Sequence, residues 1–235
     1  TQDAYSAWWN PAGLASIEIP EFAATHNASF ADVTNQYVSV AYPLRYGSTL
    51  GVSMTRMSVA PFQGFDAAGG ATRKLEANSS ALTGSYARTL IKDEIERPVL
   101  NVGVNMKSVS ETLDQASAQT MAMDVGAVYY LRPNKYWMSK VPAQEFRFAL
   151  AARNLGGSMK FDKLAFPLPQ STSFGASWIS HPYGAHTLTV SMDNTISNDE
   201  KFRTNIGAEY FMFQLFSVRA GYVTGQDIGS GVRMG

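Results

Sequence analysis

The segment VLNVGVNMK, residues 99–107, separates apolar from polar side chains with a period of two residues. One set is Leu100, Val102, Val104 and Met106, and the other set is Val99, Asn101, Gly103, Asn105 and Lys107. Successive side chains of a β-strand point to opposite sides of the pleat. The segment is therefore predicted to be a strand with one apolar face and one face of polar residues and glycine.

The same alternation recurs along most of the chain after residue 20. We expect strands near residues 22–31, 36–46, 49–58, 79–89, 98–107, 121–131, 145–153, 172–180, 185–193, 202–210 and 214–222, and a partial strand at 229–235. No helical pattern fits between them, which favours an all-β fold. Tight turns at 46–48, 181–184 and 211–213 are expected at one end of the strands, and the long loops 59–78, 108–120 and 154–171 at the other.

Composition limits the class of protein. Lys+Arg and Asp+Glu both number 19, so the formal net charge is zero, which argues against a nucleic-acid-binding protein. Charged residues make up 16% of the chain, below the roughly 25% usual in soluble domains. The chain has no cysteine, which excludes disulfides and thiolate metal sites. No apolar run reaches the length of about 18 residues that a membrane-spanning helix needs.

We interpret the chain as a transmembrane antiparallel β-barrel, with apolar side chains facing lipid and polar ones facing the interior. The alternative is a soluble β-sandwich or soluble barrel with its apolar face inward. Glycine weakens a strand, so its presence on the polar face favours the first interpretation, in which small residues leave room inside the barrel. The glycines of the polar face are Gly51, Gly103, Gly126, Gly175, Gly207 and Gly221. In this register Val104→Arg is expected to block membrane insertion and Asn105→Arg to be tolerated.

The chain is predicted to have two parts. Residues 1–20 form a helical plug segment, because Asp3 can cap a short helix and Asn10-Pro11 can begin a second helical turn. Residues 21–235 form the barrel, truncated at its C-terminal end. Residues 1–20 lack the basic start and apolar run of a signal peptide. We expect a signal peptide to have been removed or to lie outside the given sequence.

Seven charged residues are predicted to face the interior: Lys107, Asp124, Arg147, Arg153, Arg203, Glu209 and Arg219. They either line a channel or pair across the lumen and hold a plug, and we favour the second. Tyr136 and Trp137, beside Tyr129 and Tyr130, are interpreted as part of an aromatic girdle at the membrane surface.

The segment 161–169 is the strongest candidate for contact with a partner or ligand. Exposed Phe161, Leu164, Phe166 and Leu168 would be unfavourable in water, although they could instead fold over the top of the barrel. The three histidines lack the spacing of a metal site, and there is no Gly-x-Ser-x-Gly motif. We expect no enzyme activity, no metal and no cofactor.

The chain resembles a known family in several ordered stretches. Residues 3–15, which contain Asn10-Pro11-Ala12-Gly13-Leu14-Ala15, resemble a segment of the PorV/PorQ-like outer-membrane proteins, which are relatives of the FadL transporters. Further similar stretches follow in order: Asn154-Leu155-Gly156, Leu168-Pro169, residues 174–178, residues 205–210 and residues 218–222.

The resemblance implies a bacterial outer-membrane barrel of about 14 strands, of which this chain supplies about twelve. It also implies that Trp8, Trp9, Asn10 and Pro11 form a plug or gate, although they could simply pack against the inner wall. Three functions follow from it. The protein is an accessory of type IX protein secretion that docks a translocon or cargo, or a transporter of hydrophobic molecules, or an anchor of a larger surface complex.

Overall fold

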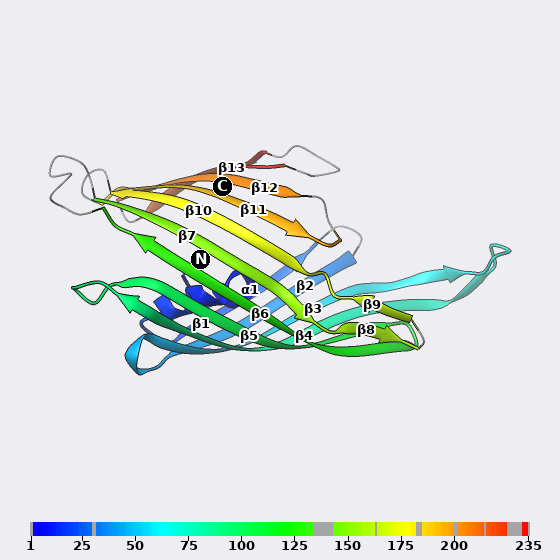
Figure 1. Cartoon of the computed structure of the whole chain (residues 1–235). Coiled ribbons are helices and arrows are strands. Elements are labelled where there is room, and N and C mark those ends of the chain that lie inside the picture. Colours follow the sequence, from blue (N-terminus) through cyan, green and yellow to red (C-terminus); the bar gives the residue numbers. More distant parts are fainter. Residues whose placement is uncertain are drawn as a thin grey trace.

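The chain consists of a short helical segment followed by a long series of β-strands (Figure 1). The structure, a computed structural model, describes residues 2–29, 32–133, 143–162, 164–181, 185–199, 202–213, 215–224 and 232–234. The helical elements are α1 (Ser6–Trp9), η1 (Pro11–Ser16) and η3 (Arg45–Gly47). None of the helices in these ranges is long and apolar enough to cross a lipid bilayer.

Among the described residues, twelve strands form one antiparallel sheet and two short strands form a separate hairpin. The strands of the sheet are β1 (Glu21–Ala28), β2 (Val33–Pro43), β3 (Ser48–Phe65), β4 (Ala71–Lys92), β5 (Pro98–Leu113), β6 (Ala116–Leu131), β7 (Ala143–Gly156), β10 (Ser171–His181), β11 (Thr187–Ser197), β12 (Arg203–Met212), β13 (Phe216–Val223) and β14 (Val232–Met234). Each pairs with its neighbours in this order. The all-β prediction and the twelve predicted strands are confirmed.

The small hairpin consists of β8 (Ser158–Phe161) and β9 (Leu164–Pro167), between β7 and β10. Within the described residues, no hydrogen-bonded ladder joins β1 to β13 or β14.

The three predicted long loops are largely strand, and the third, residues 154–171, contains the end of β7 and the β8–β9 hairpin. Residues 59–78 belong mostly to β3 and β4, which remain paired from Val59–Ala77 out to Phe65–Ala71. Residues 108–120 are the ends of β5 and β6, joined by a turn at Asp114. The prediction failed there because the strict alternation of apolar and polar residues is lost, as in Val59-Ala60-Pro61-Phe62, although the backbone pairing continues.

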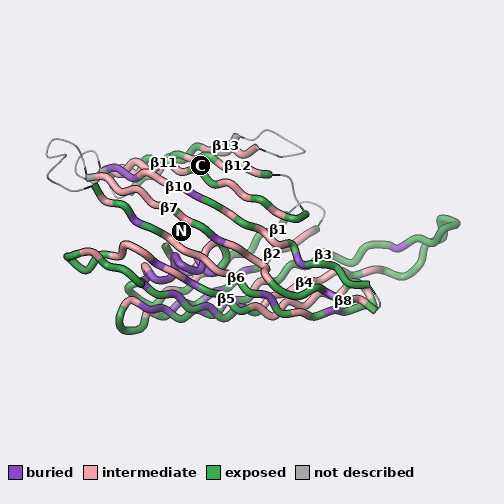
Figure 2. Tube along the Cα trace, in the orientation of Figure 1, coloured by how far each residue is buried: buried purple, intermediate pink, exposed green. Residues whose placement is uncertain are grey.

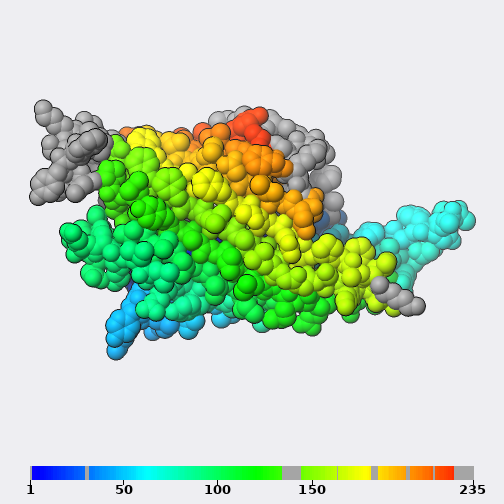
Figure 3. Space-filling model, in the orientation of Figure 1, coloured from blue at the N-terminus to red at the C-terminus, as the bar shows by residue number. Residues whose placement is uncertain are grey.

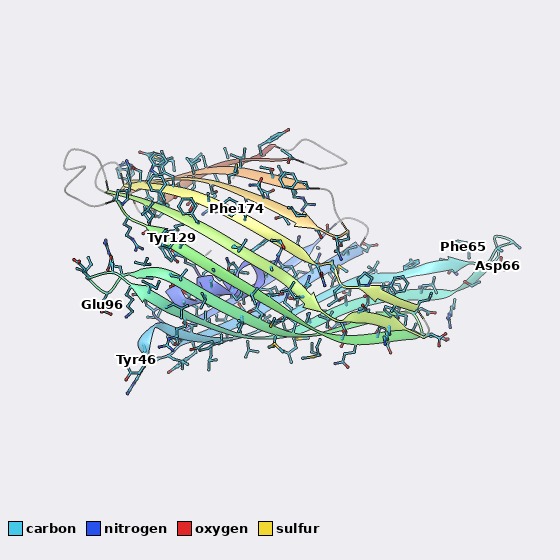
Figure 4. All side chains as sticks on the ribbon, viewed as in Figure 1. Tyr46, Phe65, Asp66, Glu96, Tyr129 and Phe174 are labelled. Carbon is cyan, nitrogen blue, oxygen red and sulfur yellow. The ribbon has the colours of Figure 1, made fainter. Side chains whose placement is uncertain are left out.

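The two ends of the sheet differ, although a tight turn at Asp114 joins β5 and β6 at the end where only long loops were predicted. Figure 4 shows Tyr46 and Glu96 at turns on one end, and Phe65 and Asp66 at the tip of the β3–β4 hairpin on the opposite end. We call the second the long-hairpin end. The turn at 46–48 is confirmed, whereas residues 182–184 of a second predicted turn lie outside the described residues.

The polar face of the sheet is covered and the apolar face is exposed. Asn101, Asn105 and Asp124 have no exposed surface, whereas half of the surface of Val40 is exposed. Figure 2 shows the same alternation of buried and exposed residues along β3 to β6. The predicted assignment of residues to the two faces is therefore correct for these strands, and the covered face is the one that a soluble sandwich would expose to water.

The N-terminal segment covers the polar face, which we call the inner face. Its apolar residues Ala7, Leu14 and Ile17 pack with Ala41 of β2 and Ala87 of β4. The η1 turn also contacts β5 and β6. One short segment can contact so many neighbouring strands only because the sheet curves around it (Figure 1).

Candidate functional site

The inner face forms a seat for the N-terminal segment, and glycines provide the space. A Cβ atom on Gly103 would lie 2.4 Å from the carbonyl carbon of Pro11, and one on Gly126 would lie 2.0 Å from Oδ1 of Asn10. Real side chains do not approach so closely, so only glycine allows the backbone of the segment this near the sheet. These two polar-face glycines therefore provide the space that the N-terminal segment occupies.

Asn10 and Pro11 hold the segment against the sheet. The Asn10 side chain accepts a hydrogen bond from the backbone N–H of Ala12 at 3.0 Å, which caps η1 as predicted. Its Nδ2 donates to the carbonyl oxygens of Ala127 in β6 and Leu150 in β7, each at 3.2 Å. Pro11 is fully buried at the first position of η1. These two residues are therefore anchors of the segment.

Trp8 and Trp9 are much more exposed than Asn10 and Pro11. They remain 43% and 56% exposed, and their rings meet edge to face with centroids 6.5 Å apart. Trp8 also contacts the ring of Tyr37, and the guanidinium of Arg153 lies 6.0 Å from the ring of Trp9. The four predicted plug residues thus divide into two anchors and two aromatic residues that are free to meet another molecule.

A buried carboxylate organises the centre of the inner face. Asp124 Oδ2 accepts hydrogen bonds from Lys107 Nζ at 2.7 Å and from Asn105 Nδ2 at 2.8 Å. Its Oδ1 accepts from the backbone N–H of Asn154 at 2.8 Å. Asp124 is fully buried and the Lys107 side chain is only 12% exposed. A buried charge is tolerated only when its partners satisfy it in this way.

Substitution of this carboxylate is expected to destabilise the protein. Asp124→Asn removes the charge that Lys107 and the two N–H donors share, which should lower the free energy of unfolding by about 1.5–3 kcal/mol. The matched control is Glu209→Gln, because Glu209 pairs with the 63% exposed Arg219 and such pairs contribute only about 0–1 kcal/mol. Urea unfolding, followed by tryptophan fluorescence, measures both, and equal losses would contradict a central role of Asp124.

The remaining predicted interior charges lie on the same face without forming one site. Glu209 and Arg219 pair between adjacent strands β12 and β13. Arg147 pairs with Glu145 on its own strand, and the half-buried Arg203 begins β12 opposite Thr195. The ion pairs seen at Asp124 and Glu209 join neighbouring strands, so the predicted pairing across the interior is not what these residues do.

Sequence reasoning missed a second polar cluster around Tyr130. Its hydroxyl receives a hydrogen bond from Gln2 Nε2 at 2.8 Å, lies 3.0 Å from Ser16 Oγ, and is contacted by Asn101 Nδ2 at 3.4 Å. Tyr130 is buried, so it does not belong to a surface girdle. The signal was available, because Tyr130 has the same strand parity as Asp124 and Gly126. Tyr136 and Trp137 lie outside the described residues.

The predicted partner loop is the β8–β9 hairpin. Leu168 is only 5% exposed and packs with Met159, Ala118 and Ala122, so the prediction that it is exposed was wrong. Phe161 is partly buried in the same cluster. Phe166 and Leu164 are exposed, as predicted, at 53% and 65%. Phe161 and Leu168 thus pack against the sheet, whereas Leu164 and Phe166 are exposed and could contact another molecule.

The buried position of Asn105 changes one expectation. Its Nδ2 also donates to the backbone oxygen of Ala7 at 2.8 Å. An arginine there would have to displace the N-terminal segment, so Asn105→Arg is not a tolerated control for an inward-facing charge.

Among the described residues, no cluster of three or more acidic or histidine side chains could hold a metal ion. The fold and this inner face define the class as an all-β protein with one large antiparallel sheet, whose polar face the N-terminal segment covers over β2 to β6. No protein-family model matches the chain. No curated protein matches it.

Proposed function

We propose that the protein is a β-barrel of the bacterial outer membrane, belonging to the PorV/FadL-like group, and that it docks a protein partner as an accessory of secretion or surface assembly. The observation that supports the membrane location is that the sheet exposes its apolar face and covers its polar face. Exposed apolar side chains on one face cost free energy in water, and a polar interior with an apolar exterior is the arrangement of outer-membrane barrels.

The long-hairpin end supports the docking role. Residues 60–76 of β3 and β4 extend beyond the last pairs with β2, at Val33–Val59, and with β5, at Ala77–Leu113. We call these residues the ribbon; Figure 3 shows it as an arm that projects from the body. In outer-membrane barrels the short turns are periplasmic and the long connections are external. The ribbon would therefore reach out from the cell surface.

The faces of the ribbon, rather than its edge, are suited to a partner. Pro61 lies in β3 beyond its last pair with β2, and the β3–β4 register shifts between Val59 and Phe62, around this proline, and between Gln63 and Phe65. Proline and bulges are common protections of a strand edge against pairing with another strand. The rings of Phe62 and Phe65 are exposed, and together with Phe166 and Leu164 of the β8–β9 hairpin they form the apolar contacts available at this end.

Replacement of the ribbon tests the docking role. A variant in which Asn-Gly replaces residues 60–76 closes the β3–β4 hairpin with a two-residue turn. We expect it to insert in the outer membrane normally but to run on native gels, after mild detergent extraction, without the partner that the unchanged protein carries. The control replaces residues 94–96 at the opposite end. An unchanged complex in the ribbon variant would contradict docking at this end.

A second function is favoured by the aromatic residues of the inner face. Trp8 and Trp9 are exposed there beside Arg153, a combination that could receive a hydrophobic molecule with a polar end, as a FadL-like transporter would. Hydrophobic molecules that co-purify with the protein, and are lost in Trp8→Ser/Trp9→Ser, would support transport over docking.

A further inference from the structure

Two segments far apart in the sequence are connected to one buried carboxylate, each through a residue that is hydrogen-bonded to it. One is the N-terminal segment inside the sheet, and the other is the chain around the β8–β9 hairpin at the long-hairpin end. We propose that Asp124 couples the two, so that displacement of the hairpin favours displacement of the N-terminal segment and the reverse. This coupling does not depend on the identity of any partner.

The first arm of the coupling runs through Asn105. Its amide Nδ2 bridges the backbone oxygen of Ala7 in α1 and Oδ2 of Asp124, with both contacts at 2.8 Å. Asn105 and Asp124 have no exposed surface. If α1 leaves, water reaches this amide and the carboxylate is no longer sealed, which changes the surroundings of a buried charge.

The second arm runs through a bulge in β7. Met123 pairs with Leu155 and Val125 with Ala152, so Arg153 and Asn154 together face the single residue Asp124. An extra residue of this kind bends a strand and re-aims its side chains. The backbone N–H of Asn154 bonds Asp124, and Asn154 has a left-handed φ of 57°.

The bulge is bonded to the β8–β9 hairpin in turn. Asn154 Nδ2 donates to the backbone oxygen of Pro169 at 2.8 Å, and Asn154 Oδ1 accepts from Lys107 Nζ at 3.0 Å. Pro169 follows Leu168, which is buried with Met159 on the inner-face residues Ala118 and Ala122. The hairpin, the bulge and the N-terminal segment therefore meet at one charge, and none can move without altering the partners of that charge.

Thiol labelling of single-cysteine variants tests the coupling, because the natural chain has no cysteine. Ser6→Cys is a near-isosteric reporter of the N-terminal segment, since Ser6 is fully buried in α1. Ala118→Cys reports on the hairpin that covers it. Labelling rates with a maleimide are measured on the full chain in outer membranes.

In each test, a substitution removes hydrogen bonds of one segment, and the labelling rate of the cysteine in the other segment is measured. Asn154→Gly retains the left-handed backbone but removes the bonds to Pro169 and Lys107, and we expect it to raise the labelling rate of Ser6→Cys by about fivefold or more. Asn105→Ala removes the bond to Ala7, and we expect a similar rise for Ala118→Cys, which Asn105 does not touch.

Ser39→Ala is the matched control for the plug side. Ser39 Oγ donates to the backbone oxygen of Ala4 at 3.0 Å, so this variant also removes one bond to the N-terminal segment but leaves the Asp124 cluster intact. Because the coupling is reciprocal, it should raise labelling of Ser6→Cys and also, by a smaller factor, that of Ala118→Cys. Unchanged labelling of Ala118→Cys in Ser39→Ala, or unchanged labelling of Ser6→Cys in Asn154→Gly, would overturn the proposal. Asn154→Gly alone decides the question if Asn105→Ala does not assemble.

Discussion

Ile206→Arg is expected to prevent stable insertion of the protein in the membrane. Ile206 is exposed on the outer face of β12, between Met192 of β11 and Tyr222 of β13, which are directly paired with it and also exposed. In the proposed membrane location, an arginine there would face hydrocarbon, at a cost of about 2–4 kcal/mol near the bilayer midplane. The measurement is the fraction of protein that resists extraction from outer membranes by urea.

Asn205→Arg is the matched control, one residue away on the opposite face. Asn205 pairs with Asp193 of β11, so the new guanidinium would lie on the inner face next to a carboxylate. We expect this variant to insert like the unchanged protein. If both arginines are tolerated, or both block insertion, the outer face of β12 does not contact lipid and the proposed location is wrong.

Much of the fold could be predicted because alternation with a period of two residues is a local property. It located all twelve strands of the sheet and assigned Val104 and Asn105 to opposite faces. It failed where that local signal ends. Beyond Val59 and Ala77 the strands lose their alternation, yet pairing between β3 and β4 continues to Phe65. Backbone hydrogen bonds do not need an apolar face, so such extensions leave no trace in the pattern.

The sequence predicted which residues of the candidate site lie on the inner face, but not which of them are hydrogen-bonded to one another. Asp124 and Lys107 were placed on the inner face by parity, and Asn10 was recognised as a helix cap. The role of Asn154 could not be predicted, because it depends on a bulge that places two residues of β7 opposite one of β6. Leu168 was misplaced for a related reason, since its burial depends on how a hairpin folds back on Ala118 and Ala122.

Gly103→Val is expected to expel the N-terminal segment from its seat. A Cβ at this position would lie 2.4 Å from the Pro11 carbonyl carbon and 2.5 Å from the Ala12 nitrogen. Both are backbone atoms, so no side-chain rotation can relieve the contact, and the whole segment must move. Overpacking of this kind costs about 1–3 kcal/mol, which corresponds to a rise of roughly 5- to 150-fold in labelling of the buried reporter Ser6→Cys if opening limits the reaction.

Gly84→Val is the control, because Gly84 lies on β4 next to β5 and a Cβ there would meet no atom within 4 Å. Its side chain would join the exposed apolar face beside Leu82 and Tyr86, where a β-branched residue is favourable. We expect this variant to leave the labelling of Ser6→Cys unchanged. Equal labelling in the two glycine variants would mean that Gly103 does not hold the segment. If the labelling rate of Ser6→Cys rises only in Gly103→Val, the absence of a side chain at Gly103 is what allows the N-terminal segment to remain on the inner face.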